Sequence, residues 1–278
     1  MGIGYTQEEL EKVKIATLNI LKKTIECCEE LKISYFLAYG TALGAVRHKG
    51  FIPWDDDIDI GLTRDNYERF LREAPKWFEG SGMFVEHLIT EKQCPYTYAK
   101  VKLDGTKFIE YCHRNVKCHH GVFIDVFPFD ALPVSVEEQK KQYDKVQKLA
   151  KCYVYRQTPD ISEKPTNIKL IIKQIVRRLL HYLLLPKSAD SIYAKLTDEM
   201  TKYNGCNSGI YGCLFYPKFK AGCMTKDMVS NLKKIKFEDL EASVPADIET
   251  YLESQYGDYM TLPPVEERVG HRPYKVEI

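Results

Sequence analysis

The strongest chemical signal in the sequence is a short acidic segment set among apolar residues. From Ile52 to Ile60 it reads Ile-Pro-Trp-Asp-Asp-Asp-Ile-Asp-Ile, which places four carboxylates in five positions. If Asp55 to Ile60 is a strand, alternation puts Asp55, Asp57 and Asp59 on one face, where they repel one another unless a cation lies among them. Mg2+ and Mn2+ take such oxygen ligands, so we predict a metal site. An acidic loop or a strand edge protected by charge is the alternative.

A further carboxylate lies inside an apolar segment. Residues 123–129 read Phe-Ile-Asp-Val-Phe-Pro-Phe, a run typical of a buried strand, with Asp125 near its middle. An unpaired carboxylate there would be costly or protonated, so we expect a cation beside it. The alternative is a hydrogen-bonded structural aspartate.

The residues ahead of the acidic segment have the pattern of a phosphate site. Residues 33–39 are apolar and aromatic, as in a buried strand, and they end at Gly40-Thr41. From Ala42 the pattern is helical, with Thr41 predicted as the N-cap. A strand, a Gly-Thr turn and a helix N-terminus together offer N–H groups and a favourable dipole to a phosphate.

Two lysines lie on one face of another predicted strand, 96–103. Lys100 and Lys102 share that face with Tyr96 and Tyr98. They could meet phosphates, or they could be solvated lysines on an exposed strand.

Together these segments closely resemble the signature of the LicD/fukutin phosphotransferases, which look like members of the nucleotidyltransferase-fold superfamily. The blocks that carry the resemblance are Gly40-Thr41-x-Leu43-Gly44, Arg47-His48-x-Gly50, the run from Phe51 to Gly61, Tyr98-Ala-Lys100-Val, Asp104-Gly-Thr106, Gly121 to Pro128, and the C-terminal block from Tyr256 to His271. They cover most of the chain. The C-terminal block is either a clasp that docks the tail or a part of the substrate site.

The resemblance implies roles for specific residues. Asp57, Asp59 and Asp125 would be metal ligands, and Asp55 would orient the metal or accept a proton from the acceptor hydroxyl. The residues expected to bind substrate are Gly40, Thr41, Arg47, His48, Trp54 and Lys100.

The resemblance also implies an activity, because the family moves a phospho-substituent from a CDP-linked donor to a sugar hydroxyl and releases CMP. We expect phosphocholine transfer from CDP-choline to a cell-surface glycan precursor, such as teichoic acid, lipopolysaccharide or capsule, which could be lipid-linked. CDP-ribitol is the donor of the fukutin branch. The alternatives are a nucleotidyltransferase that moves NMP to a small molecule, and a non-catalytic glycan- or metal-binding protein on the same scaffold.

Composition limits the partners and the cellular location that we expect for the protein. The 278 residues carry 40 basic and 39 acidic side chains, which gives no reason to expect a nucleic-acid partner. We see no apolar run long enough for a membrane span and no export signal, and nine cysteines do not resemble a disulfide framework, so we expect a cytoplasmic protein. A cluster between Cys112 and His120 has residue types that bind zinc, although its spacing matches no structural zinc pattern. Its members are Cys112, His113, Cys118, His119 and His120.

Residues 164–187 combine six Lys or Arg, no acid, and an apolar face at helical spacing. A basic amphipathic helix of this kind can lie on an anionic membrane, here the inner face. The alternative is a helix that packs its apolar face on the core and exposes its basic face.

We therefore expect one α+β domain over residues 1–278. Residues 1–130 would form a nucleotidyltransferase-like mixed sheet with covering helices. Residues 131–278 would be mainly helical and would shape the acceptor site.

Overall fold

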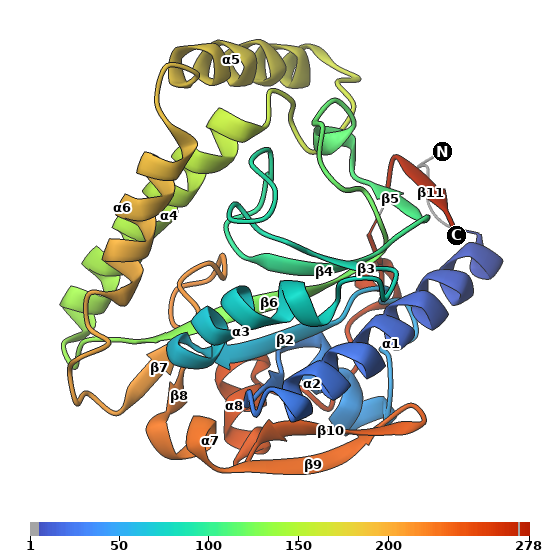
Figure 1. Ribbon diagram of the computed structural model, residues 1–278, viewed down its shortest axis with the longest axis vertical. Helices are drawn as coiled ribbons and strands as arrows, with labels where there is room; N and C mark the ends of the chain where they lie inside the picture. The colour runs from blue at the N-terminus through green and yellow to red at the C-terminus, as the bar shows by residue number, and fades with distance from the viewer. Residues whose placement is uncertain (1–5, 272) are drawn as a thin grey trace.

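A mixed β-sheet forms the centre of the computed structural model, which describes residues 6–271 and 273–278 (Figure 1). Its strands run in the order β1-β2-β6-β4-β3, and β7 and then β8 extend it beyond β6. The strands are β1 (Phe36–Leu37), β2 (Asp59–Thr63), β3 (Met83–Glu86), β4 (Ala99–Leu103), β6 (Phe123–Ala131), β7 (Ile210–Gly212) and β8 (Met224–Thr225). Strands β2 and β6 are parallel and their other pairings are antiparallel, so the sheet is mixed.

Two long helices, α1 (Gln7–Glu30) and α3 (Arg64–Trp77), pack on the sheet. Helix α1 begins with the capping box of Thr6 and Glu9 that the sequence predicts. Its buried residues recur at helical spacing, so one apolar face of the helix covers the sheet. They are Val13, Ala16, Thr17, Ile20, Leu21, Thr24, Cys27 and Cys28.

A second group of elements packs along the β1–β2 side of the sheet. It comprises α2 (Tyr39–His48), α7 (Lys226–Ser230), the hairpin of β9 (Leu232–Phe237) and β10 (Leu240–Pro245), and α8 (Ile248–Tyr256). Helix α2 contacts β2, β9 and α8, so residues far apart in the sequence surround the connection between β1 and β2.

The remaining helices form an arm. Helices α4 (Val136–Gln157) and α6 (Ala189–Thr201) pack together, and α5 (Ile168–Leu184) crosses their end, far from the sheet at the top of Figure 1. None of the described helices has the length and apolar composition needed to cross a membrane.

The chain ends beside the middle of the sequence. Strand β11 (Lys275–Glu277) pairs with β5 (Lys107–Ile109), and short 3-10 turns lie at Tyr111–His113 and Val265–Glu267. The expected mixture of sheet and helices is therefore confirmed. The described part of the later half, which we expected to be mainly helical, also carries five short strands, of which β7 and β8 join the main sheet and β11 pairs with β5.

Candidate active site

Four carboxylates meet where β2 and β6 run side by side. The parallel register places Asp59, the first residue of β2, opposite Asp125 of β6. Asp55 and Asp57 come from the segment that leads into β2, and each affects the pKa of another carboxyl in the group. We call Asp55, Asp57, Asp59 and Asp125 the carboxylate cluster.

The strand predicted over residues 55–60 is wrong in extent, because β2 begins only at Asp59. The expectation that Asp55, Asp57 and Asp59 converge is nevertheless met, since these three carboxyls interact electrostatically. Asp56 bonds His271 of the C-terminal tail, and its carboxylate lies close to that of Asp57.

Burial and mutual repulsion shift the acidity of the cluster. Burial, followed by the charges of Asp57 and Asp56, raises the pKa of Asp55 to about 8. Burial, followed by Asp57 and Asp125, raises the pKa of Asp59 well above its ordinary value. At neutral pH the cluster must therefore retain protons or bind a cation. Its clustered carboxylate oxygens suit a hard divalent ion such as Mg2+, which would displace those protons.

Lys100 is the positive partner of Asp125. The two residues lie opposite each other on the antiparallel strands β4 and β6, and Lys100 Nζ donates a hydrogen bond to Asp125 Oδ1. The amine also lies 4.3 Å from the ring centroid of Tyr96 and 3.4 Å from that of Phe123. Lys100 and Lys102 are both buried, so the solvated-lysine alternative is wrong. The cation expected beside Asp125 is thus supplied, at least in part, by Lys100.

His271 brings the C-terminal tail to the cluster. Its Nδ1 donates to Asp56 Oδ1 at 2.8 Å and lies 3.8 Å from Asp57 Oδ2. The hydrogen bond to Asp56, helped by the charge of Asp57, outweighs burial and raises the pKa of His271 to about 10. The tail therefore clasps the acidic segment, as one of our two readings of the C-terminal block expected. Sequence reasoning assigned His271 no individual role, and its place at the end of the C-terminal block was the one signal that pointed to it.

The first turn of α2 faces the cluster, but its capping differs from the prediction. The N-cap is Ala38, so the expectation that Thr41 caps the helix is wrong. Thr41 Oγ1 instead accepts a 2.8 Å hydrogen bond from the backbone N–H of Asp59. A Cβ added at Gly40 would lie 3.0 Å from Asp55 Oδ2, so the glycine leaves room for that carboxylate.

The other expected substrate residues form a separate group at the far end of α2. Arg47 Nε donates to His48 Nε2 at 3.0 Å, and Arg47 also donates to the carbonyl of Tyr259. The rings of His48 and Trp54 lie 6.5 Å apart, and the guanidinium of Arg268 lies 5.3 Å from the Trp54 ring. Arg47 follows Gly40 by seven positions in α2, so the two residues lie about 10 Å apart along the helix axis. The structure thus divides the predicted substrate residues between the two ends of α2.

A cavity of about 230 Å3 opens beside the cluster. Asp57, Asp125, Lys100 and His271 line it together with aromatic and polar residues that the sequence did not place. These are Tyr96, Tyr98, Phe108, Phe123, Glu110 and His113.

Glu110 gives this cavity a negative wall. Although burial opposes ionisation, the hydrogen bond and charge of His113 hold the pKa of Glu110 far below its ordinary value. Tyr96 also donates a hydrogen bond to Glu110 at 3.1 Å. The site therefore combines acidic and aromatic surfaces in one hollow.

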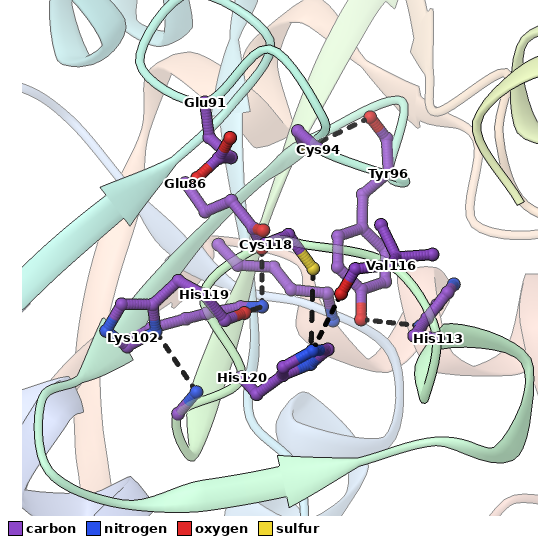
Figure 2. Close-up of polar contacts among 12 residues, drawn as sticks. Glu86, Glu91, Cys94, Tyr96, Lys102, His113, Val116, Cys118, His119 and His120 are labelled. Carbon is purple, nitrogen blue, oxygen red and sulfur yellow. Dashed lines mark hydrogen bonds and ion pairs between the residues drawn. The ribbon is translucent and has the colours of Figure 1, made fainter.

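The Cys/His residues considered for zinc do not meet at one point (Figure 2). Cys118 Sγ points to His120 Nδ1 at 4.0 Å, whereas His113 is directed to Tyr96. His119 bonds Asp104 instead. Cys112 lies near His113 and Glu110, so the five residues separate into smaller groups.

Comparison with known proteins gives the family. Residues 32–159 match the family described as LicD/FKTN/FKRP, nucleotidyltransferase domain. The chain is 29% identical over 272 residues to the lipopolysaccharide cholinephosphotransferase LicD of Haemophilus influenzae, covering 94% of this chain and 95% of that protein. An uncharacterized protein of Rickettsia prowazekii is 38% identical over 120 residues, covering 41% of this chain and 45% of its own length. One of Rickettsia typhi is 24% identical over 212 residues, covering 74% and 67%.

Residues 32–159 thus match the LicD/FKTN/FKRP family, and the chain is similar over nearly its whole length to a named cholinephosphotransferase, which identifies it as an enzyme of the phosphotransferase class. The family resemblance drawn from the sequence motifs is thereby confirmed.

Proposed function

We propose that this LicD-like chain transfers phosphocholine from CDP-choline to a sugar hydroxyl of a cell-surface glycan precursor and releases CMP. The observation that carries the proposal is the half-buried carboxylate cluster at the β2–β6 junction. It occurs in a chain that resembles, over nearly its whole length, a protein named as a lipopolysaccharide cholinephosphotransferase. The mixed sheet and the match of residues 32–159 also support a nucleotidyltransferase-like core, as we expected.

Asp57, Asp59 and Asp125 would hold Mg2+ or Mn2+. Their raised pKa values, caused first by burial, support this assignment because a bound cation relieves the same repulsion that the protons relieve. When bound, the ion supplies charge neutralisation and polarises a phosphoryl oxygen of the donor.

Asp55 is our candidate for the general base. With a pKa raised to about 8, chiefly by burial and by Asp57, its carboxylate is basic enough to take the proton of the acceptor hydroxyl. The hydroxyl oxygen then forms a bond to the phosphorus that carries choline. The bond from that phosphorus to the bridging oxygen breaks, and CMP leaves with the oxygen and its electron pair.

Cations at both ends of α2 support binding of the diphosphate. Lys100 lies at the cluster, near the first turn of the helix that holds Gly40 and Thr41. Arg47 and His48 lie at its last turn, with Trp54 as an aromatic border. This arrangement suits an extended donor whose phosphates lie near the cluster and whose nucleotide reaches toward Arg47.

The cavity beside the cluster suits a quaternary ammonium group. Tyr98 and Phe108 offer aromatic surface next to the rings that contact Lys100, and Glu110 supplies a negative charge. Choline is recognised by such aromatic surroundings. This combination favours a choline donor over the uncharged polyol of CDP-ribitol.

The later half of the chain would shape the acceptor site. Cavities of about 430 and 670 Å3 lie against α4, and each shares lining residues with the cavity at the cluster. Val154 of α4 lines all three. An acceptor glycan, free or lipid-linked, could approach the cluster along this path at the inner face of a membrane.

The test is product analysis with purified protein, Mg2+ and a glycan acceptor. The donors to compare are CDP-choline, CDP-ethanolamine, CDP-glycerol and CDP-ribitol. We expect CMP and a phosphocholine-modified glycan from CDP-choline, at a rate at least 10-fold above the other donors. Release of pyrophosphate from a nucleoside triphosphate would indicate NMP transfer instead. Turnover of none of these donors would favour a non-catalytic binding protein and overturn the proposal.

A further inference from the structure

Helix α5 turns its apolar face away from the protein. At 100° per residue its exposed large apolar side chains occupy one continuous arc of roughly 140°. Ile172, Ile175 and Leu179, near the middle of this arc, are 55%, 61% and 57% exposed. Figure 1 shows the helix at the end of the helical arm, away from the sheet. The alternative that α5 packs its apolar face on the core is therefore wrong.

The opposite face of α5 is polar and is fixed to the arm by specific bonds. Gln174 accepts a hydrogen bond from the N–H of Ile161 and donates to Asp160 Oδ1. Arg177 donates to the carbonyls of Thr158 and Val154. His181 Nδ1 pairs with the carbonyl of Tyr155 at 3.0 Å.

Gln174 and Arg177 are buried by these contacts. Rolling α5 to bury its isoleucines would leave those polar groups without their partners, which opposes such a rotation. The polar contacts on the opposite face thus hold the apolar face of α5 outward.

Positive charge borders this face. On the helical wheel Lys169 and Lys173 flank one side of the apolar arc and Arg178 flanks the other. Residues 164–187 contain no Asp or Glu. Arg178 also pairs with Asp160, whereas the lysines project from the exposed side of α5.

We propose that α5 docks in the surface of an anionic lipid bilayer, with Ile172, Ile175 and Leu179 among the acyl chains and Lys169 and Lys173 at the headgroups. A high apolar moment with a basic border is the pattern of helices that lie in the membrane interface. A second copy of this chain fits less well. A two-fold pairing of α5 helices would bring two basic, acid-free segments together.

Docking through α5 would place the bilayer beside a cavity that shares lining residues with the cavity at the carboxylate cluster. A cavity of about 430 Å3 beneath the helix is lined by Lys173, Val176 and Arg177 of α5. His113 and Val154 line both this cavity and the one at the carboxylate cluster. A membrane-anchored acceptor would then enter through this cavity, an inference that rests on the proposed function. The docking of α5 does not rest on it.

The test is co-sedimentation of the full chain with lipid vesicles. One set is made of phosphatidylcholine and the other of phosphatidylcholine with about a third phosphatidylglycerol. We expect binding to the anionic set, at least 10-fold weaker binding to the neutral set, and weakening as salt rises from 0.1 to 0.5 M.

The double variant Ile175→Asp/Leu179→Asp should lose at least 10-fold in binding to anionic vesicles. Ile15→Asp is the matched control, because Ile15 is 69% exposed on α1 and should not affect binding. Asp57→Ala should bind vesicles as the wild type does, which separates docking from catalysis. Equal binding by the α5 double variant would overturn the proposal. The proposal would also be overturned if the wild type did not bind vesicles but formed a dimer in light scattering, and if the double variant abolished that dimer.

Discussion

Negative charge is concentrated at the carboxylate cluster beyond what its neighbours neutralise. Burial raises the pKa of Asp125, and the charges of Lys100 and His271 lower it. The effect of burial is larger, so the pKa lies above its ordinary value. His271 is also committed to Asp56 by a 2.8 Å hydrogen bond. The cluster therefore keeps an excess of negative charge, which a divalent ion or retained protons must neutralise. At the scale of single residues, catalysis depends on holding these carboxylates at fixed positions.

Gly40→Ala tests that positional demand. The added methyl would lie 3.0 Å from Asp55 Oδ2, so the carboxylate must move by a few tenths of an ångström. We expect CMP release to fall about 10-fold because a displaced base is poorly aligned. Thermal stability should not fall, since alanine is favoured over glycine within a helix.

Gly205→Ala provides the control for this comparison. A Cβ at Gly205 meets no atom within 4 Å, and the residue is remote from the cluster in the loop after α6. Its activity should match the wild type. Full activity of Gly40→Ala would show that Asp55 does not require its present position.

At the scale of elements, the junction between α2 and β2 determines where Asp59 lies. The side chain of Thr41 crosses from the helix to the first backbone N–H of β2, and it is buried. Strand β6 then holds the opposite side of β2 through the parallel register. The cluster is thus assembled by three elements that meet at one point.

Thr41→Val tests this junction with a nearly isosteric change. Valine cannot accept the hydrogen bond, so the N–H of Asp59 loses its partner in a buried place. We expect the free energy of unfolding in urea to fall by about 1–3 kcal/mol. Thr41→Ser, which keeps the hydroxyl, should recover most of the loss. An unchanged unfolding free energy for Thr41→Val would mean that the bond does not stabilise the junction.

Sequence reasoning identified the acidic segment and β6 well because their chemistry is local. The run of aspartates and the isolated Asp125 each imply an unusual electrostatic environment whatever the surrounding fold. The cap at Thr41 was misassigned because Tyr39, which begins α2, has a φ of 48° that few non-glycine residues adopt. Its N–H bonds the hydroxyl of Tyr251, more than 200 residues away, which no local pattern reveals.

Long-range contacts also explain what the sequence missed at the site. His271 reaches Asp56 because Gly270 passes close to the carbonyl of Trp54, where an added Cβ would lie 2.4 Å away. The orientation of α5 was left open because periodicity finds an apolar face but does not say which face the protein covers. The contacts of Gln174, Arg177 and His181 with the arm decide that question.

At the scale of the whole molecule, the helical arm is joined to the sheet by buried polar contacts. His87, directly after β3, is one of them. Its Nε2 lies 2.6 Å from the hydroxyl of Tyr193 in α6, and its Nδ1 accepts a hydrogen bond from Ile89. Both ring nitrogens of the neutral imidazole are hydrogen-bonded. Protonation of His87 would therefore disturb a contact between the sheet and the arm.

The acid sensitivity of the fold follows from this histidine. Burial, helped by Arg64, lowers the pKa of His87 to about 4, from 6.5 in the unfolded chain. As pH falls from 6.5 to 4 the unfolded state gains a proton that the folded state does not, so His87 lowers the free energy of unfolding over that window. The contribution should approach about 3 kcal/mol.

Urea titrations from pH 7 to pH 4 check this expectation. His87→Gln should show a weaker loss of stability across the window than the wild type. Above pH 7, where the imidazole is neutral in both states, the pH dependence of the two proteins should be the same. Parallel curves throughout would show that His87 is not the responsible group.

The most direct test of the carboxylate cluster is the rate of CMP release from CDP-choline after removal and return of Mg2+. We predict that chelation abolishes release, that Mg2+ restores it, and that Asp57→Ala reduces it by at least 1,000-fold in saturating metal, since the phosphoryl transfer depends on this electrostatic stabilisation. Asp239→Ala, at an exposed aspartate on the β9–β10 turn, should retain wild-type activity. Metal-independent release, or a fully active Asp57→Ala enzyme, would contradict the role of the cluster as a metal-dependent catalytic centre.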